Sequence, residues 1–151
     1  MSNDRGFEHI VVAFDGSKDS VKAVQVASSL AAKFKAKVTI VHVYGSPAVI
    51  FAAGPGMTMP DYKDLEDAAK QTGQSVLEEG VRLATKVGVK ANGELLEGPS
   101  VVEALIGFAA NEKADLIVVG TRGMTGFKKL VLGSVSSGLV GHAHCPVMVV
   151  R

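Results

Sequence analysis

Short apolar runs alternate along this chain with longer segments in which apolar residues recur every three or four positions. The short runs predict β-strands buried in a sheet, and the longer segments predict amphipathic helices. The predicted strands span residues 9–14, 37–43, 91–97, 115–119 and 146–150. The predicted helices span residues 17–34, 61–87, 100 to about 112, and 134–143. A capping box opens the third helix, since Ser100 is expected to accept from the backbone N–H of Glu103 and Glu103 to reach back.

This alternation predicts an α/β protein with an open five-stranded parallel sheet and helices on both faces. Ligands in such sheets bind where the strand order reverses. If the loops after the first and fourth strands form one site, those strands are neighbours, which gives the order 3-2-1-4-5. Both strands are almost wholly apolar, as central strands should be, whereas strand 91–97 is polar enough for an edge.

The strand at 146–150 is expected at the opposite edge, although it is apolar along its length. An exposed apolar edge favours pairing with another chain. We therefore expect a homodimer formed edge to edge through this strand. The alternative is that a helix or the chain end covers it.

Composition narrows the classes of partner. The 151 residues are 21% charged with a formal net charge of +1, and aromatic residues make up only 5%. This balance gives no general attraction to nucleic acid or to an anionic membrane. The single Cys145 fits a reducing compartment, and the chain shows neither a signal-type apolar core nor an apolar run of membrane-spanning length. We expect one cytoplasmic domain over residues 1–151.

A glycine-rich loop from Gly120 to Ser134 joins the fourth strand to the last helix. Glycines let the backbone approach an anion closely, and the N–H groups and positive end of the following helix attract it. Arg122, Lys128 and Lys129 bring positive charge nearby. The loop therefore predicts a phosphate site. The alternative is a long turn with glycines for geometry and lysines for solubility.

The second half of this site is expected at Asp15, which follows the first strand. Its carboxylate would reach a ribose hydroxyl or a phosphate-bound divalent cation. The alternative for Asp15 is a turn residue or a cap on the following helix, and Ser17 is itself a candidate N-cap. Val43 ends the second strand, where its backbone would pair with an adenine edge while its side chain packs on the ring.

These residues resemble the nucleotide-binding branch of the universal stress proteins. That family's signature is glycine, two residues, glycine, nine residues, glycine, then serine or threonine. This chain matches both spacings with Gly120, Gly123, Gly133 and Ser134. The opening segment 10–17 and the closing segment 144–151 also resemble the ends of the family, so the resemblance covers essentially the whole chain.

The resemblance implies a Rossmann-like fold of the adenine nucleotide alpha hydrolase type, with ATP between the first and fourth strands and homodimers through the last strand. It places Ala13, where relatives can carry proline, and Asp15 near the nucleotide, with Val43 beside adenine. Ribose and phosphate would be approached by Gly120 and Gly123, with Arg122 between them. The phosphates would lie on Gly133, Ser134, Val135 and Ser136.

Histidines and a long proline-rich segment complete the candidate chemistry. The residues His142, His144 and Cys145 cluster, but structural zinc normally needs four ligands, and histidines in the last turn of a helix also bind its carbonyls. His42 is expected to be hydrogen-bonded within its strand, and His9 only to begin the first strand. Segment 45–60 is a candidate lid over the adenine pocket or a partner surface, or else a loop that packs on a neighbour.

The sequence shows no Walker A motif, no serine–histidine–acid set with evident spacing and no dedicated cluster of metal carboxylates. The leading hypothesis is a stress-response regulatory protein that binds ATP with Mg²⁺ or Mn²⁺ and hydrolyses it slowly or not at all. ADP and AMP remain alternative ligands. The alternative functions are a slow ATPase or ATP-cleaving enzyme, and a nucleotide-free interaction module on the same fold.

Overall fold

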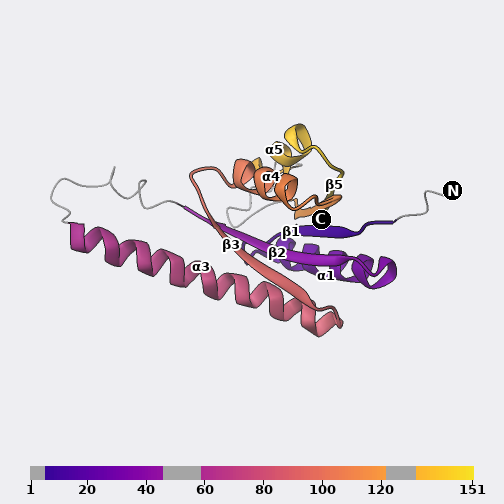
Figure 1. The fold of residues 1–151 in the computed structure, drawn as a ribbon, viewed down its shortest axis with the longest axis horizontal. Coiled ribbons are helices and arrows are strands. Elements are labelled where there is room, and N and C mark those ends of the chain that lie inside the picture. Colours follow the sequence, from indigo (N-terminus) through magenta and orange to yellow (C-terminus); the bar gives the residue numbers. More distant parts are fainter. Residues whose placement is uncertain (1–5, 46–58, 122–131) are drawn as a thin grey trace.

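The computed structural model describes residues 6–45, 59–121 and 132–151 (Figure 1). Its centre is a five-stranded sheet in the order β3-β2-β1-β4-β5, and every neighbouring pair of strands is parallel. This order confirms the predicted one. The strands are β1 (His9–Ala13), β2 (Lys37–Tyr44), β3 (Ala91–Glu97), β4 (Leu116–Gly120) and β5 (Val147–Val150).

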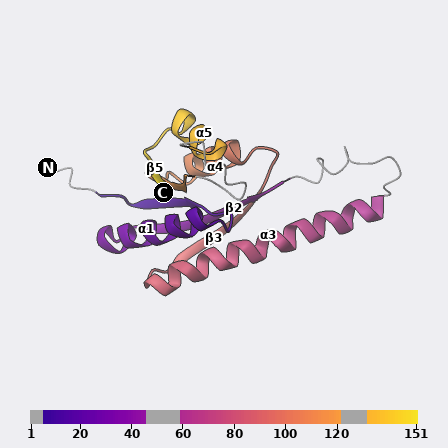
Figure 2. The ribbon, with the colours of Figure 1, turned by 180° about the vertical axis from the view of Figure 1, so that it is seen from behind.

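Helices cover both faces of the sheet, as predicted (Figures 1 and 2). One face packs against α1 (Lys18–Phe34) and α3 (Met59–Val87). The other packs against α4 (Val101–Asn111) and α5 (Ser134–His142). Within the described ranges, no helix combines the length and apolar character needed to cross a membrane.

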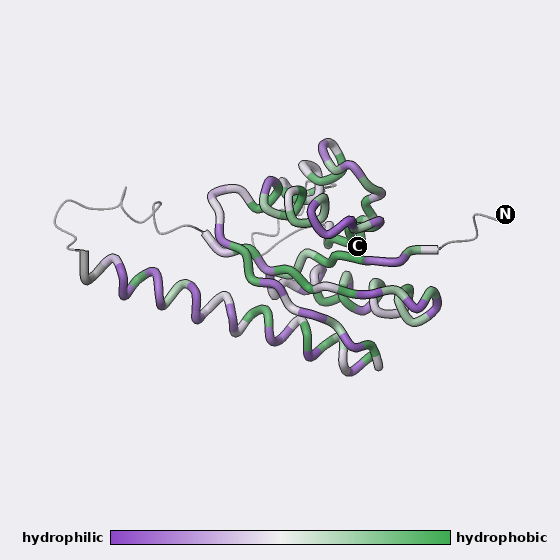
Figure 3. The backbone as a smooth tube through the Cα atoms, viewed as in Figure 1, coloured by the Kyte–Doolittle hydropathy of each residue, from purple (hydrophilic) through white to green (hydrophobic). Residues whose placement is uncertain are grey.

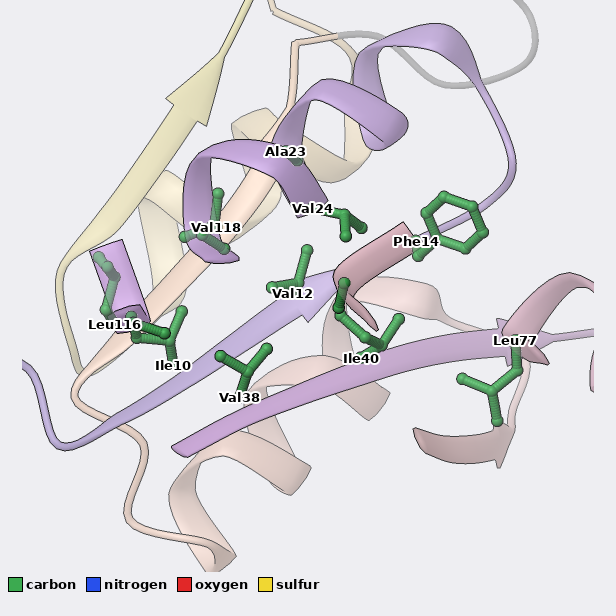
Figure 4. Packing of buried hydrophobic residues seen from close by; sticks show 13 residues of the cluster. Ile10, Val12, Phe14, Ala23, Val24, Val38, Ile40, Leu77, Leu116 and Val118 are labelled. Carbon is green, nitrogen blue, oxygen red and sulfur yellow. The ribbon is translucent and has the colours of Figure 1, made fainter. Parts of the chain in front are cut away.

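Alternate residues of the central strands feed two separate apolar clusters, because successive side chains of a strand point to opposite faces. Ile10 and Val12 face the α1 and α3 layer (Figure 4), whereas Val11 and Ala13 face α4 and α5. Apolar positions accordingly concentrate along the inner strands (Figure 3). The ends of the central strands are thereby fixed between two packed layers.

Helix starts follow the capping residues of the sequence. Ser17 precedes α1 as its N-cap, and its hydroxyl accepts from the Ser20 N–H at 3.2 Å. Ser100 likewise accepts from the Glu103 N–H at 3.2 Å, which confirms that half of the predicted capping box. Since α3 begins at Met59, residues 46–58 of the segment considered as a lid or partner surface lie outside the described residues.

His9 does more than begin β1. It is buried, with Nε2 2.8 Å from the Thr39 hydroxyl of β2 and Nδ1 3.2 Å from the carbonyl oxygen of Glu112 after α4. The Asp115 carboxylate accepts from the backbone N–H groups of both Glu8 and His9. This network ties the start of β1 to its neighbours at the sheet edge opposite the candidate site.

Candidate functional site

Asp15 shapes the turn that follows β1. Its Oδ1 accepts from the Ser17 N–H at 2.9 Å, and Gly16 between them has a φ of +85°, a conformation that favours glycine. The turn role considered for Asp15 is therefore present in the structure. This bond uses one carboxylate oxygen, so the half-buried side chain can still present Oδ2 to a ligand.

Gly120 allows α1 to cross the end of β4. A Cβ on Gly120 would lie only 2.8 Å from the backbone carbonyl carbon and from the Cβ of Asp19. The first turn of α1 therefore packs directly on this strand end, with Asp19 at the junction. The sequence offered no signal for Asp19, because nothing local marks which helix turn meets the glycine.

The start of α5 is bonded back to the end of β4. The Gly133 N–H donates to the carbonyl oxygen of Thr121 at 2.6 Å. The buried Ser136 hydroxyl donates to the same oxygen at 3.0 Å and to the Gly133 carbonyl at 3.1 Å. The Ser136 hydroxyl proton is therefore used in hydrogen bonds to the protein's own backbone. The Ser136 group that can donate to a phosphate is its backbone N–H.

The N-terminus of α5 supplies an anion-binding end. Its N-cap is Gly133, with no side-chain capping bond. The N–H groups of the first helical turn, which include those of Ser134 and Val135, have no acceptor within the helix. Together with the positive end of the helix dipole they can bind a phosphate.

The structure brings most of the predicted site residues to one edge of the sheet. Ala13, Val43 and Gly120 lie at or next to the ends of β1, β2 and β4, and Asp15 lies in the turn after β1. The start of α5, from its N-cap Gly133 to Ser136, lies beside them. Ala13 and Val43 pack in the same apolar cluster, on the α4 and α5 side. Arg122 and Gly123 lie outside the described residues.

His142 contacts a helix carbonyl, as the sequence indicated, whereas His42 contacts the segment after β1 and not its own strand. His142 Nδ1 lies 3.1 Å from the Gly138 carbonyl one turn earlier in α5, and His42 Nδ1 lies 2.8 Å from the Phe14 carbonyl. No group of three or more metal-ligating side chains occurs in the part of the chain that the structure describes. Burial, followed by the charge of Asp115, raises the pKa of the Cys145 thiol, which disfavours the thiolate.

Known proteins identify the family. The sequence model of the universal stress protein family matches residues 6–151. The chain belongs to this family. A universal stress protein of Methanocaldococcus jannaschii is 35% identical over 145 residues, which cover 96% of this chain and 82% of that protein. The Bacillus subtilis universal stress protein YxiE is 33% identical, over 96% of this chain and 99% of its own length.

Solved structures agree on the fold. A universal stress protein crystallised in complex with cAMP superposes with a TM-score of 0.68 at 28% identity, covering 96% of this chain and 97% of its own. UspA of Lactobacillus plantarum reaches a TM-score of 0.78 at 23% identity, covering 95% of this chain and 97% of its own. An Arabidopsis thaliana family member with AMP bound reaches 0.66 at 21% identity, covering 95% and 90%. This universal stress protein therefore has the Rossmann-like fold expected from its sequence.

Proposed function

We propose that this universal stress protein binds an adenine nucleotide, with ATP as the physiological ligand, and acts as a stress-response regulator in the cytoplasm with little or no hydrolysis. The convergence of two helix starts at one strand end carries this proposal. The first turn of α1 packs on Gly120, and the N-cap of α5, Gly133, is bonded to Thr121, the residue after Gly120. Two helix N-termini at one point favour a polyanionic ligand.

The ligands of related proteins support adenine as the base of the bound nucleotide. The structure at 28% identity was solved with cAMP, and fold neighbours were solved with AMP and with dAMP. Their ligands share the adenine ring and differ in the sugar and phosphate. We assign adenosine to Ala13, Asp15 and Val43, and the phosphates to Gly120, Arg122 and Gly123 together with Gly133, Ser134, Val135 and the Ser136 N–H.

A divalent cation fits this site only if the phosphates of the nucleotide supply most of its ligands. Among the described residues no ready-made set of metal ligands exists, and Asp15 is the acidic residue in the turn after β1. Mg²⁺ is commonly held by one or two carboxylates together with substrate phosphates. Asp15 Oδ2 would provide the protein ligand to Mg²⁺ or Mn²⁺ carried by ATP.

We further propose a homodimer through residues 146–150. Ile117 N–H donates to Pro146 O and Thr121 N–H to Val150 O, so alternate residues of β5 face β4. The backbone groups of Val147 and Val149 consequently point away from β4, toward the outer edge. Val149→Pro removes one outward N–H and is expected to shift the protein from dimer to monomer in analytical ultracentrifugation. A wild-type monomer at high concentration would exclude this interface.

Calorimetric titration of ATP–Mg²⁺ into nucleotide-stripped protein, with mass spectrometry of any co-purifying nucleotide, tests the binding function. Saturation at one site per chain is expected. Gly133 has φ −73° and ψ 173°, which any residue adopts, so Gly133→Val should abolish binding by blocking close approach while the fold persists.

Gly141→Val is the matched control, because a Cβ at this glycine near the other end of α5 meets nothing within 4 Å. It should bind ATP like the wild type. If Gly133→Val bound ATP with wild-type affinity, the phosphates would have to bind elsewhere than at Gly133. An intact wild-type fold that binds no adenine nucleotide would support the interaction-module alternative, and rapid release of phosphate or pyrophosphate would support an enzyme.

A further inference from the structure

His42 links β2, which also carries Val43, to the segment after β1 that carries Asp15. Its Nδ1 lies 2.8 Å from the carbonyl oxygen of Phe14. A carbonyl only accepts hydrogen bonds, so Nδ1 carries the proton in this contact. The Phe14 carbonyl belongs to the peptide group that ends in the nitrogen of Asp15, and His42 directly precedes Val43. His42 thus contacts the peptide group that precedes Asp15, and it directly precedes Val43 in the chain. Both Asp15 and Val43 are predicted to bind the ligand.

The His42 ring acts where the backbone ladder between β1 and β2 stops. Ala13 pairs with Val41, and the Phe14 N–H donates to the Val41 carbonyl at 2.9 Å. In a parallel pair, the N–H and C=O groups of every second residue face the same neighbouring strand. The backbone N–H and C=O groups of Val41 face β1, so the backbone groups of Val43 face the β1 side too. In a continued ladder its N–H would donate to Phe14 O, the oxygen that His42 Nδ1–H binds instead.

The surroundings of His42 hold the ring in this position. A Cβ on Gly73 of α3 would lie 3.5 Å from His42 Cδ2 and 3.1 Å from Leu95 Cδ1, so the glycine leaves space for the ring between helix and sheet. On the other side of the peptide, Asp15 N lies 3.4 Å from the Ser20 hydroxyl. The His42 contact is the shorter and stronger of the two.

We propose that His42 is the positioning residue for the adenosine half of the site. Its hydrogen bond fixes the peptide that carries Asp15 and leaves the N–H of Val43 for the edge of an adenine base. This inference rests on the proposed nucleotide binding and deepens it. It assigns the spacing between the ribose contact and the adenine contact to a side chain that itself touches neither.

Calorimetric titrations of AMP and of tripolyphosphate into the full chain test this role. His42→Leu removes the donor, and the affinity for AMP should fall about tenfold, the size of one lost hydrogen bond. The affinity for tripolyphosphate should not change, since it uses the Gly120 and α5 half of the site. His42→Asn places an amide N–H near the position of Nδ1 and should restore AMP affinity to within about threefold.

His142→Leu is the matched control. It also removes a histidine-to-carbonyl hydrogen bond, that of His142 to Gly138, but in the last turn of α5. Equal AMP affinity in the wild type and His42→Leu would overturn the positioning role and leave nucleotide binding intact. A parallel loss for AMP and tripolyphosphate would also overturn it, by showing a general disturbance. A wild type that binds no AMP would overturn the proposed function itself.

Discussion

The N–H of Gly133 and the carbonyl oxygen of Thr121 are joined by a hydrogen bond of 2.6 Å. Thr121 is also anchored to the last strand, since its N–H and its hydroxyl both donate to Val150 O, at 2.8 and 2.7 Å. The residues that flank the glycine-rich segment are therefore held together by the protein's own hydrogen bonds. A phosphate would therefore bind where Thr121 and Gly133 are already held together, and its binding would not have to bring these residues together.

Ser136→Ala tests this arrangement, because the buried hydroxyl binds the carbonyls of both Thr121 and Gly133. We expect a loss of about 1 kcal/mol in the free energy of unfolding, as for one buried hydrogen bond. Urea titration measures it. Ser137→Ala, at the exposed neighbouring position, should stay within about 0.5 kcal/mol of the wild type. Equal effects of the two substitutions would contradict a role specific to Ser136.

Gly120→Ala is expected to destabilise the fold before any ligand is considered. The new Cβ would lie 2.8 Å from the Asp19 backbone, so the first turn of α1 must move. Overpacking of this kind costs about 1–3 kcal/mol. Thermal unfolding measures the loss. Gly107→Ala in α4, where a Cβ meets nothing within 4 Å, should instead be stabilising. A Gly120→Ala protein as stable as the wild type would disprove the close contact.

Ser28→Ala should stabilise the protein. Ser28 is fully buried in α1, and its hydroxyl has no hydrogen-bond partner among the described residues. Replacing it removes an unsatisfied polar group, which is worth about 1 kcal/mol or more. Ser29→Ala, at an exposed position of the same helix, should gain only the difference in helix propensity, less than about 0.7 kcal/mol. Chemical denaturation of both variants separates these contributions. A destabilised Ser28→Ala would reveal a hidden partner.

Stability should decline at alkaline pH partly through Cys145. Burial raises the pKa of its thiol in the folded state, and the charge of Asp115 adds to the shift. The resulting stabilisation is complete below the unfolded thiol pKa of about 8.5 and is lost as pH rises toward the folded pKa. Urea titrations from neutral to alkaline pH should show a smaller decline in Cys145→Ala. Tyr44, whose pKa is also raised, chiefly by burial, remains in both proteins. Identical pH profiles would remove Cys145 as a contributor.

Much of this fold followed from local pattern. Strand and helix segments were predicted because side-chain periodicity is written into consecutive residues, and the capping role of Ser100 needed only a residue three positions away. The order of the strands followed from placing the Asp15 turn beside the glycine-rich loop. The roles of His9 and Ser136 could not be predicted in this way, because their partners come from other elements or from across a loop.

The sequence by itself determined the order of the elements, the glycine signature and the family, all of which depend on short-range spacing. Only the tertiary structure decided that Gly120 packs on Asp19 and that His42 bonds Phe14. The physical reason is that a close approach or a hydrogen bond between distant residues depends on how packed layers fix two strand ends in space. The periodicity of residues along the chain does not determine the distance between two such strand ends.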